Sequence, residues 1–393
     1  MPSVDGGHED LVCSSRKAAK EFSPRRKPWV LSEKLDPAPE GRKKSRYVRF
    51  LRDEISADSD FLSRTRSALQ SSNLVTRRRA RLPTSSQTAF NGHSMVGTLQ
   101  RVLVCSPQIA GWNQPERAAR WRDLGFHHPP DFATAQSQHE ALCRELEAAG
   151  AEVLDAPPAA DLSLDAVYAH DASLATDFGL IVMRPGKPNR IPEGRNQSSF
   201  CTRLGIPTLA KIVAPATTEA GDILWLEGRK VEEKTSAGKT LDAKTLLVGH
   251  GHRTNANGIA QLRDLLAPRG VDVLSAPLPY GPGPSACLHL MSLISLLDEQ
   301  TALVDLPWLA VETVEQLQSR GYKFIPIDDS ERDTLACNVL ALGGNRLLAI
   351  AENRQTNDRL RQAGFDVRTF PGSEICINGS GGPTCLTRPL LRG

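Results

Sequence analysis

A cysteine close to the C-terminal end of the chain is the first candidate for chemistry. Cys385 lies in "GGPTCLTRPLLRG", shortly after the pair Gly381 and Gly382, which would let a ligand approach the backbone closely. A thiolate is a strong nucleophile, but it needs access to its target, a base, and a group that recognises charge. Most cysteines are instead buried and inert, so Cys385 alone is weak evidence.

Side chains of the required types occur in three other motifs. His289 in "ACLHLMSLIS" can act as a general acid or base, and carboxylates come from Glu219 and Asp222 in "TTEAGDILWLEG" and from Asp171 in "VYAHDASLAT". Taken singly, such a histidine is usually a core residue, and acids at strand starts usually cap turns. Together they could form one nucleophilic site, provided that the fold brings the four segments together.

The elements that must position these residues repeat along the chain. Five helix-to-strand junctions each contain a glycine, and consecutive glycines are 55, 65, 51 and 43 residues apart. The five are Gly150, Gly205, Gly270, Gly321 and Gly364. A glycine after a periodic helix predicts a left-handed cap, and a period of roughly 50 residues indicates a repeat architecture. We therefore predict that residues 95–393 form one α/β domain.

The two ends of this domain are predicted to pair with each other. Apolar, hairpin-like strands precede each helix, "QRVLVCSP" comes before the first helix, and "PTCLTRPLL" remains after the last. Pairing these two strands would close a ring of five units and remove exposed sheet edges. In such a ring equivalent strand starts converge on the axis, so the candidate residues would meet there.

The residues before this domain have a different composition. Residues 1–94 contain 19 Lys and Arg against 11 Asp and Glu, whereas the remainder has 29 against 34. Runs such as "GRKKSR" without apolar periodicity predict a disordered, solvated basic extension, with attraction to nucleic acid or a membrane as the alternative. The chain lacks the ~20-residue apolar stretch of a membrane span, and its eight cysteines form no CxxC pair. We expect a cytoplasmic protein without a metal site.

Several motifs resemble those of the guanidino-group-modifying enzymes: dimethylargininases, arginine deiminases and amidinotransferases. The resemblance covers residues 100–392 and is carried by these motifs: "AVYAHDASLATDFGLIVMRPGKPNR", "EAGDILWLEG", "VGHGHRTNANG", "LHLMSL", "CNVLA" and "GGPTCLTRPL". It implies the fold of that superfamily, a five-bladed α/β propeller (pentein) of ββαβ repeats with pseudo-fivefold symmetry. This expectation agrees with the five glycine junctions.

The resemblance also implies roles for individual residues. Cys385 would be the nucleophile, His289 the general acid and base, and Glu219 with Asp171 the carboxylates that grip a guanidinium. The remaining residues that match substrate-side positions are Asp165, Arg190, Asp222 and Arg253. Carboxylates suit this task because a guanidinium is planar and cationic and forms charge-assisted hydrogen bonds.

The implied reaction is hydrolysis of a C–N bond at the guanidinium carbon through a covalent thiouronium intermediate. The preferred substrate is Nω,Nω-dimethylarginine, which would give citrulline and dimethylamine. Neither a metal nor an organic cofactor is expected. A small-molecule guanidino compound is the expected partner, nucleic acid is not, and a homodimer stays open. The alternatives are an arginine deiminase, an amidinotransferase, and a non-catalytic propeller that binds a partner.

Two positions depart from the patterns of the superfamily. Met291 stands two residues after His289, where deiminases and amidinotransferases carry an acid. Loss of that acid would favour a methylated substrate with fewer N–H donors, provided that Met291 points into the pocket. His170 precedes Asp171 where bacterial dimethylargininases carry an acid, and a change of charge in the pocket would put the substrate in doubt.

Overall fold

The computed structural model describes residues 89–226, 244–281, 283–284, 286 and 288–393. The predicted basic extension therefore lies outside the described residues, apart from its last six residues. Those six residues contact the domain: Asn91 exchanges two hydrogen bonds with the backbone of Arg392, and the ring of His93 packs against Trp225. Described residues ahead of the boundary predicted at residue 95 thus contact the domain.

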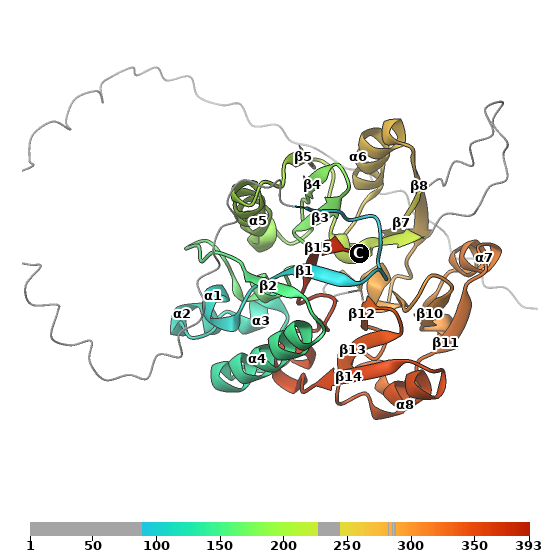
Figure 1. The fold of residues 1–393 in the computed structure, drawn as a ribbon. Helices are drawn as coiled ribbons and strands as arrows, with labels where there is room; N and C mark the ends of the chain where they lie inside the picture. Colours follow the sequence, from blue (N-terminus) through green and yellow to red (C-terminus); the bar gives the residue numbers. More distant parts are fainter. Residues whose placement is uncertain (1–88, 227–243, 282, 285, 287) are drawn as a thin grey trace, which may run out of the picture. The chain divides into compact units, whose positions relative to one another are not determined.

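The described residues form five three-stranded sheets, seen in Figure 1. In their hydrogen-bonded order these sheets are β15(Arg388–Arg392)-β1(Leu99–Val104)-β2(Glu152–Asp155), β3(Ser173–Thr176)-β4(Gly179–Val182)-β5(Thr208–Lys211), β6(Ile223–Leu226)-β7(Lys244–His250)-β8(Val271–Pro277), β9(Ile294–Leu296)-β10(Thr301–Val304)-β11(Lys323–Pro326) and β12(Leu340–Gly343)-β13(Arg346–Ile350)-β14(Asp366–Phe370). The helices are α1(Pro107–Ala110), α2(Pro115–Ala118), α3(Trp121–Leu124), α4(Phe132–Ala148), α5(Ile191–Arg203), α6(Ala256–Leu266), α7(Val311–Ser319) and α8(Arg354–Gln362).

All five sheets share one pattern of pairing. The first two strands are antiparallel, and the third runs parallel to the second after a helical crossover, as β6, β7, α6 and β8 show. A parallel neighbour requires such a crossover because the chain must return to the same end of the sheet. The five predicted glycines all have positive φ, between +77° and +96°, which confirms the predicted left-handed caps.

The two ends of the domain pair with each other, as predicted. Strand β15 is antiparallel to β1, with Val102 opposite Pro389 and Leu103 opposite Arg388. The last strand therefore takes the first position in a sheet whose other two strands come from the start of the domain. This pairing fixes the loop before β15, which contains Cys385.

Neighbouring sheets contact one another along the chain. Strand β15 contacts β3, β1 contacts β12, and a bridge between Arg184 and Thr218 joins the segment after β4 to the segment before β6. The turn η5 (Leu290–Ser292) contacts both β6 and β9, and Ser295 on β9 donates to the carbonyl of Cys337, close to β12. Each of the five sheets thus touches two others.

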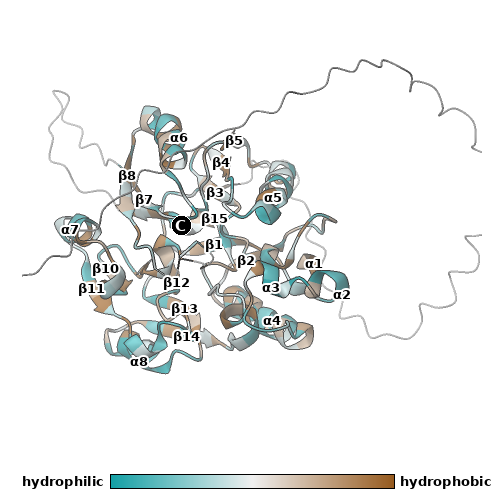
Figure 2. Cartoon of the chain, turned by 180° about the vertical axis from the view of Figure 1, so that it is seen from behind, coloured by the Kyte–Doolittle hydropathy of each residue, from teal (hydrophilic) through white to brown (hydrophobic). Residues whose placement is uncertain are grey.

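Apolar side chains fill the space among the sheets and helices. Figure 2 shows hydrophilic residues gathered on helices such as α6 and α8, whereas the strands are largely hydrophobic. The largest fully buried side chains include Trp112, Trp225 and Phe370. Within the described residues, no helix combines the length and apolar character that a membrane crossing would need.

The pairing of β15 with β1 can be tested through a buried residue of β15. Leu390 has no solvent exposure and packs in the cluster that surrounds β1 and α4. Leu390→Ala should lower the free energy of unfolding by about 2–5 kcal/mol, because it removes buried methyl groups and leaves a cavity. Urea unfolding measures the change. The control Val311→Ala, at a 70% exposed position, should change it by less than about 0.5 kcal/mol. Equal stabilities of the two variants would contradict the packing described for β15.

Candidate active site

The candidate residues gather at one cavity of about 720 Å³. Cys385, His289 and Asp171 lie on its wall, together with three of the remaining candidates, Asp165, Arg190 and Arg253. Glu219 and Asp222 have no solvent exposure and lie behind the wall. The structure therefore brings all eight predicted residues to this cavity or directly behind it.

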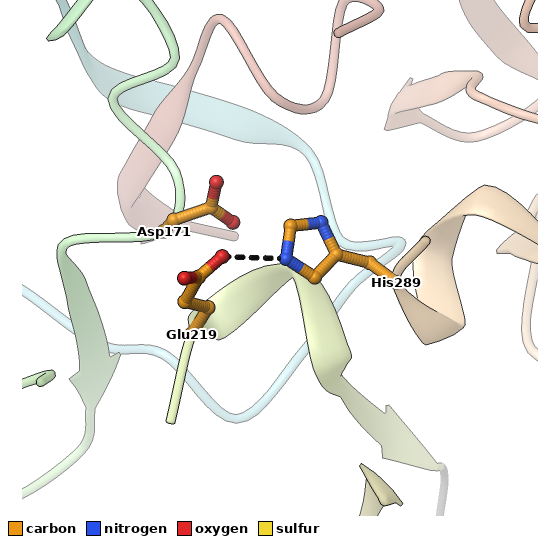
Figure 3. A group of neighbouring side chains, drawn as sticks. All are labelled: Asp171, Glu219 and His289. Atoms are coloured by element: carbon orange, nitrogen blue, oxygen red, sulfur yellow. Dashed lines mark hydrogen bonds and ion pairs between the residues drawn. The ribbon is translucent and has the colours of Figure 1, made fainter. Parts of the chain in front are cut away.

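Each central residue stands shortly before the first strand of its sheet. Asp171 precedes β3, Glu219 precedes β6, His289 precedes β9, and Cys385 precedes β15. One ligand atom from each of Asp171, Glu219 and His289 lies within 4.8 Å of the other two. Figure 3 shows these three side chains pointing toward one another from separate segments. This confirms that equivalent strand starts meet.

The imidazole of His289 and the carboxylate of Glu219 form the innermost pair. His289 Nε2 lies 2.7 Å from Glu219 Oε2, and Glu219 Oε1 accepts the N–H of Gly186 at 2.8 Å and lies 3.5 Å from Arg253. Burial alone raises the pKa of Glu219, but the hydrogen bond and charge of His289 outweigh burial and hold this pKa below its ordinary value. Glu219 therefore carries a negative charge that fixes the imidazole.

Asp171 supplies a second ionised carboxylate. Its Oδ1 accepts the N–H of Gly221 at 2.9 Å, and its Oδ2 accepts Arg190 Nη1 at 2.6 Å. Burial raises its pKa, but the charges of His289 and Arg190 lower it well below the ordinary value. A side chain at Gly221 would not fit, because its Cβ would lie 2.7 Å from Asp171 and 2.8 Å from His289.

Arg190 is held by protein groups at the cavity wall. Besides Asp171, its guanidinium donates to both carboxylate oxygens of Glu193, at 3.0 and 2.8 Å, and to the carbonyl of Tyr168 at 2.8 Å. Burial raises the pKa of Glu193 to about 7 despite this partner, and the two carboxylates hold the pKa of Arg190 well above its ordinary value. The predicted substrate-side role of Arg190 stays a prediction.

Asp165 and Asp222 occupy different positions relative to the cavity. Asp165 lies on the wall, where its Oδ2 accepts Asn189 at 2.9 Å and Lys187 at 3.3 Å. Asp222 is absent from the wall, and its Oδ1 accepts the N–H of Leu290 at 3.0 Å. Burial raises the pKa of Asp222 to about 6. The predicted contact of Asp222 with substrate stays a prediction; in this position the carboxylate holds the backbone beside His289.

Cys385 lines the cavity, which distinguishes it from the five other thiols among the described residues. Its side chain is partly exposed at the cavity, and its Sγ lies 3.1 Å from Asn338 Nδ2. Burial raises the pKa of Cys105, Cys337 and Cys376, and it raises the pKa of Cys201 to about 11. These four thiols stay protonated and enclosed, so they are poor nucleophiles.

The glycine pair before Cys385 serves a purpose that the sequence did not indicate. A Cβ at Gly381 would overlap the ring of Tyr168, and a Cβ at Gly382 would lie 2.6 Å from Asn338 Oδ1. We expected the two glycines to admit a ligand. Gly381 lines the cavity, and side chains at the two glycines would meet Tyr168 and Asn338, which hold the loop that contains Cys385.

The two departures from the superfamily pattern both lie off the cavity wall. Met291 is buried in an apolar cluster beside Leu296 and Val339 and does not line the cavity with Cys385. His170 is also buried, its Nδ1 bonds the carbonyl of Thr387 at 2.8 Å, and burial lowers its pKa to about 3. The expectation that His170 changes the charge at a position lining the pocket was wrong, because the ring is buried off the cavity wall. Met291 does not line the pocket either, so the condition under which it would favour a methylated substrate is not met.

Asp171, Glu219 and His289 are also the one group among the described residues with the spacing of a metal site. Two carboxylates and one imidazole could bind a divalent cation. The same set fits a guanidinium, whose N–H donors need carboxylate acceptors. A chelation experiment distinguishes the two uses.

Sequence reasoning missed two residues of the site. Asn338 lies in the quoted motif "CNVLA" and contacts Cys385, but an asparagine beside a short strand gives no signal of its own. Lys187 lies in "GKPNR", lines the cavity and contacts Asp165. Its position within a motif that carried the resemblance could have identified it.

The chain is similar in sequence and fold to several known proteins. A family model described as "Arginine deiminase" matches residues 301–392. An N(G),N(G)-dimethylarginine dimethylaminohydrolase from Streptomyces coelicolor is 28% identical over 262 residues, which cover 65% of this chain and 86% of the relative. The solved DDAH from Pseudomonas aeruginosa, complexed with citrulline, has 23% identity and a TM-score of 0.57 and covers 75% of this chain and 100% of its own. SxtG, an amidinotransferase from Microseira wollei, has 16% identity and a TM-score of 0.61 and covers 77% of this chain and 97% of its own.

The solved structures share the mixed α/β fold of this chain. In sequence and fold the chain is similar to the guanidino-group-modifying enzymes. Among these enzymes, the dimethylarginine dimethylaminohydrolases match it over most of their own length.

The burial of His170 leads to a test by pH. In the unfolded chain its pKa is near 6.5, whereas in the folded protein it is about 3. As pH falls through 6.5, the unfolded state binds a proton that the folded state does not, so stability is lost. His170→Asn should remove this contribution, and between pH 6.5 and 5 the wild type should lose up to about 1.4 kcal/mol per pH unit more than the variant.

Urea unfolding at several pH values measures both slopes. The raised pKa values of Glu193 and Asp222 act in the opposite direction, but they are common to both proteins and cancel in the difference. Identical slopes for wild type and variant would show that the ring of His170 takes up a proton in the folded state.

Proposed function

We propose that this protein hydrolyses a C–N bond at the guanidinium carbon of an arginine derivative, with Nω,Nω-dimethylarginine as the preferred substrate and citrulline and dimethylamine as products. One observation carries the proposal: Cys385, His289 and Asp171 line the same cavity, and Glu219 lies 2.7 Å from His289 behind its wall. A nucleophile, an acid–base group and two carboxylates are thus present together.

The geometry suits a cationic, planar substrate. Asp171 and Glu219 are both ionised, and their oxygens lie within 4.8 Å of the His289 ring. A guanidinium bound between them replaces lost hydration with charge-assisted hydrogen bonds. The carboxylates also fix its plane, so that the central carbon faces Cys385.

The reaction then proceeds in two stages. The Cys385 thiolate donates an electron pair to the guanidinium carbon, and the resulting tetrahedral adduct collapses when the C–N bond to the leaving amine breaks. His289 gives a proton to that amine, and a thiouronium remains on the sulfur. Water then attacks the same carbon while His289 takes one of its protons. The C–S bond breaks, the second proton passes to solvent, and the ureido product leaves with the thiolate restored.

Besides binding the guanidinium, Glu219 also acts on the reaction through its contact with His289. Its carboxylate stabilises the imidazolium form, which must exist before the amine can be protonated. Because Glu219 is fully buried and accepts a backbone N–H as well, it cannot swing away from the ring without losing both partners. The imidazole is therefore kept in one orientation through both stages.

The choice of a dimethylated substrate rests on the dimethylarginine dimethylaminohydrolases among the relatives. Met291 no longer supports it, because this side chain lies off the cavity wall. Arginine itself is the second candidate, since the family model that matches residues 301–392 is that of arginine deiminase. The two substrates differ in the amine released, so one assay decides between them.

We also propose that the five sheets are the blades of a five-bladed propeller around this cavity. The shared pairing pattern and the chain of contacts between neighbouring sheets support this arrangement. Four buried thiols and a thiol nucleophile suit a reducing compartment, so we place the enzyme in the cytoplasm. A homodimer stays a prediction.

A panel of substrates tests the proposed reaction. The full chain is incubated with arginine, monomethylarginine, Nω,Nω-dimethylarginine and agmatine, and both the amine and the ureido product are identified. We expect the highest kcat/KM for the dimethylated compound. Cys385→Ser should lose at least about 10³-fold in kcat, because a hydroxyl is a far poorer nucleophile at neutral pH. Excess EDTA should leave the rate unchanged, whereas a loss of activity would assign the Asp171–Glu219–His289 group to a metal.

Other outcomes of the same panel assign the alternatives. Ammonia released fastest from arginine identifies a deiminase, and a requirement for an amine acceptor identifies an amidinotransferase. Absence of turnover, together with absence of a mass adduct on Cys385 after treatment with a thiol-reactive guanidino analogue, leaves a non-catalytic binding protein.

Substitution of the buried carboxylate tests its role. Glu219→Gln keeps the shape of the side chain but removes the charge that holds the substrate and supports the imidazolium. We expect kcat/KM to fall by about 10²-fold or more, and steady-state kinetics measure it. Glu312→Gln on the exposed side of α7 is the matched control and should behave as wild type. A value for Glu219→Gln within a factor of about two of wild type would remove Glu219 from the mechanism.

A further inference from the structure

Asn338 contacts the sulfur of Cys385 from a neighbouring sheet. It stands immediately before Val339 and β12, is 5% exposed, and lines the cavity. Its side-chain Nδ2 lies 3.1 Å from Cys385 Sγ, within the range of an N–H to sulfur hydrogen bond. This contact joins the nucleophile to an element that none of the predicted site residues occupies.

The orientation of the Asn338 amide follows from its other contact. Its Oδ1 lies 3.0 Å from the backbone nitrogen of Thr384, which can only donate a hydrogen bond. The atom facing Thr384 must therefore be the amide oxygen, and the atom facing the sulfur must be the NH₂ group. A flipped amide would set two donors against each other at Thr384.

The backbone on both sides of Asn338 is fixed as well. The hydroxyl of Ser295 donates to the carbonyl of Cys337 at 2.6 Å and accepts the N–H of Val339 at 3.2 Å. Gly382 leaves the room that the Asn338 side chain occupies, since a Cβ there would lie 2.6 Å from Oδ1. Asn338 is thus held before any substrate arrives.

We propose that Asn338 is the positioning residue of the nucleophile: its amide N–H aims the Cys385 sulfur into the cavity and stabilises that sulfur as a thiolate. The inference rests on the proposed role of Cys385 as the nucleophile. A hydrogen bond donated to the charged form of a group favours that form. An amide does this without carrying a charge, so, unlike a lysine or arginine, it does not repel a cationic guanidinium from the sulfur.

Other titratable groups also surround Cys385. Asp171 and His289 share the cavity wall with it, Tyr168 packs against Gly381, His170 donates its backbone N–H to the Cys385 carbonyl, and Cys376 lies within electrostatic range. Each of them is retained when Asn338 is replaced. A comparison of Asn338 variants with wild type therefore isolates the effect of the amide.

Alkylation of the thiol by iodoacetamide tests the proposal without a substrate. The rate of labelling of the peptide that contains Cys385 is followed by mass spectrometry as a function of pH, in the full-length protein. Asn338→Asp keeps the acceptor for Thr384 but places a carboxylate against the sulfur, whereas Asn338→Ala removes both contacts. We expect the pH midpoint of alkylation to rise by about one unit in Asn338→Ala and by more in Asn338→Asp.

Two controls separate positioning from general damage to the loop. Thr384→Val removes the hydrogen bond from the Thr384 hydroxyl to the Val339 carbonyl, at 3.2 Å, but keeps the amide on the sulfur. Its midpoint should stay within about 0.2 units of wild type. Cys385→Ser should show no label on this peptide. Thermal unfolding confirms that each variant folds, and if Asn338→Asp does not, Asn338→Ala decides.

Unchanged midpoints in the folded Asn338 variants would overturn the proposal, and so would an equal shift in Thr384→Val. The result is independent of the proposed reaction. A shifted midpoint in a protein without hydrolase activity would support the role of Asn338 at the sulfur and reject the proposed function. An unchanged midpoint in an active hydrolase would reject the role of Asn338 and support the proposed function.

Discussion

Glu219 is a carboxylate without solvent exposure, and its ionised form can exist there only because its oxygens are matched by donors. Removing a charge from water costs several kcal/mol unless partners and hydrogen bonds replace the lost hydration. Here His289, Arg253 and the N–H of Gly186 face the two oxygens. These partners come from different segments of the chain, so the charge can be accommodated only after several sheets have assembled.

The need for close contact between these charged groups also explains why glycines occur at fixed positions in the site. Gly221 has no room for a side chain between Asp171 and His289, and Gly382 has none beside Asn338. Larger residues at these positions would push apart the groups whose charges and hydrogen bonds depend on contact. The charged side chains of the site can therefore contact one another only if the backbone around them is closely packed. Both requirements apply where strand starts from different sheets meet.

Much of this arrangement could be predicted from the sequence, because it follows from short local patterns. The five helix-ending glycines required left-handed backbone, and the apolar strands at the two ends needed partners, so the repeats and their closure by β15 and β1 could be recognised. The position of each candidate before the first strand of a repeat then placed Asp171, Glu219, His289 and Cys385 together. The resemblance to known enzymes supplied the roles.

The direction of individual side chains could not be predicted in the same way. Met291 and His170 sit beside site residues in the sequence, yet both point into packed surroundings away from the cavity. Met291 lies in the short helix η5 and His170 in a turn, so strand alternation does not set their directions, and which side faces the cavity depends on the neighbouring sheet. Asn338 was missed for the related reason that its partners, Thr384 and Cys385, are distant in the sequence and lie in a different sheet unit.

The pairing of β15 with β1 also governs the order in which the protein can be built on the ribosome. Strand β1 is synthesised early, and its partner follows only after all the other sheets; 295 residues separate Gly97 from Arg392, which bonds its carbonyl. Until then one edge of β1 carries open backbone groups that can pair with another chain. Cys385 enters just ahead of the strand that covers this edge, so the candidate site stays incomplete while nascent chains are most exposed to aggregation.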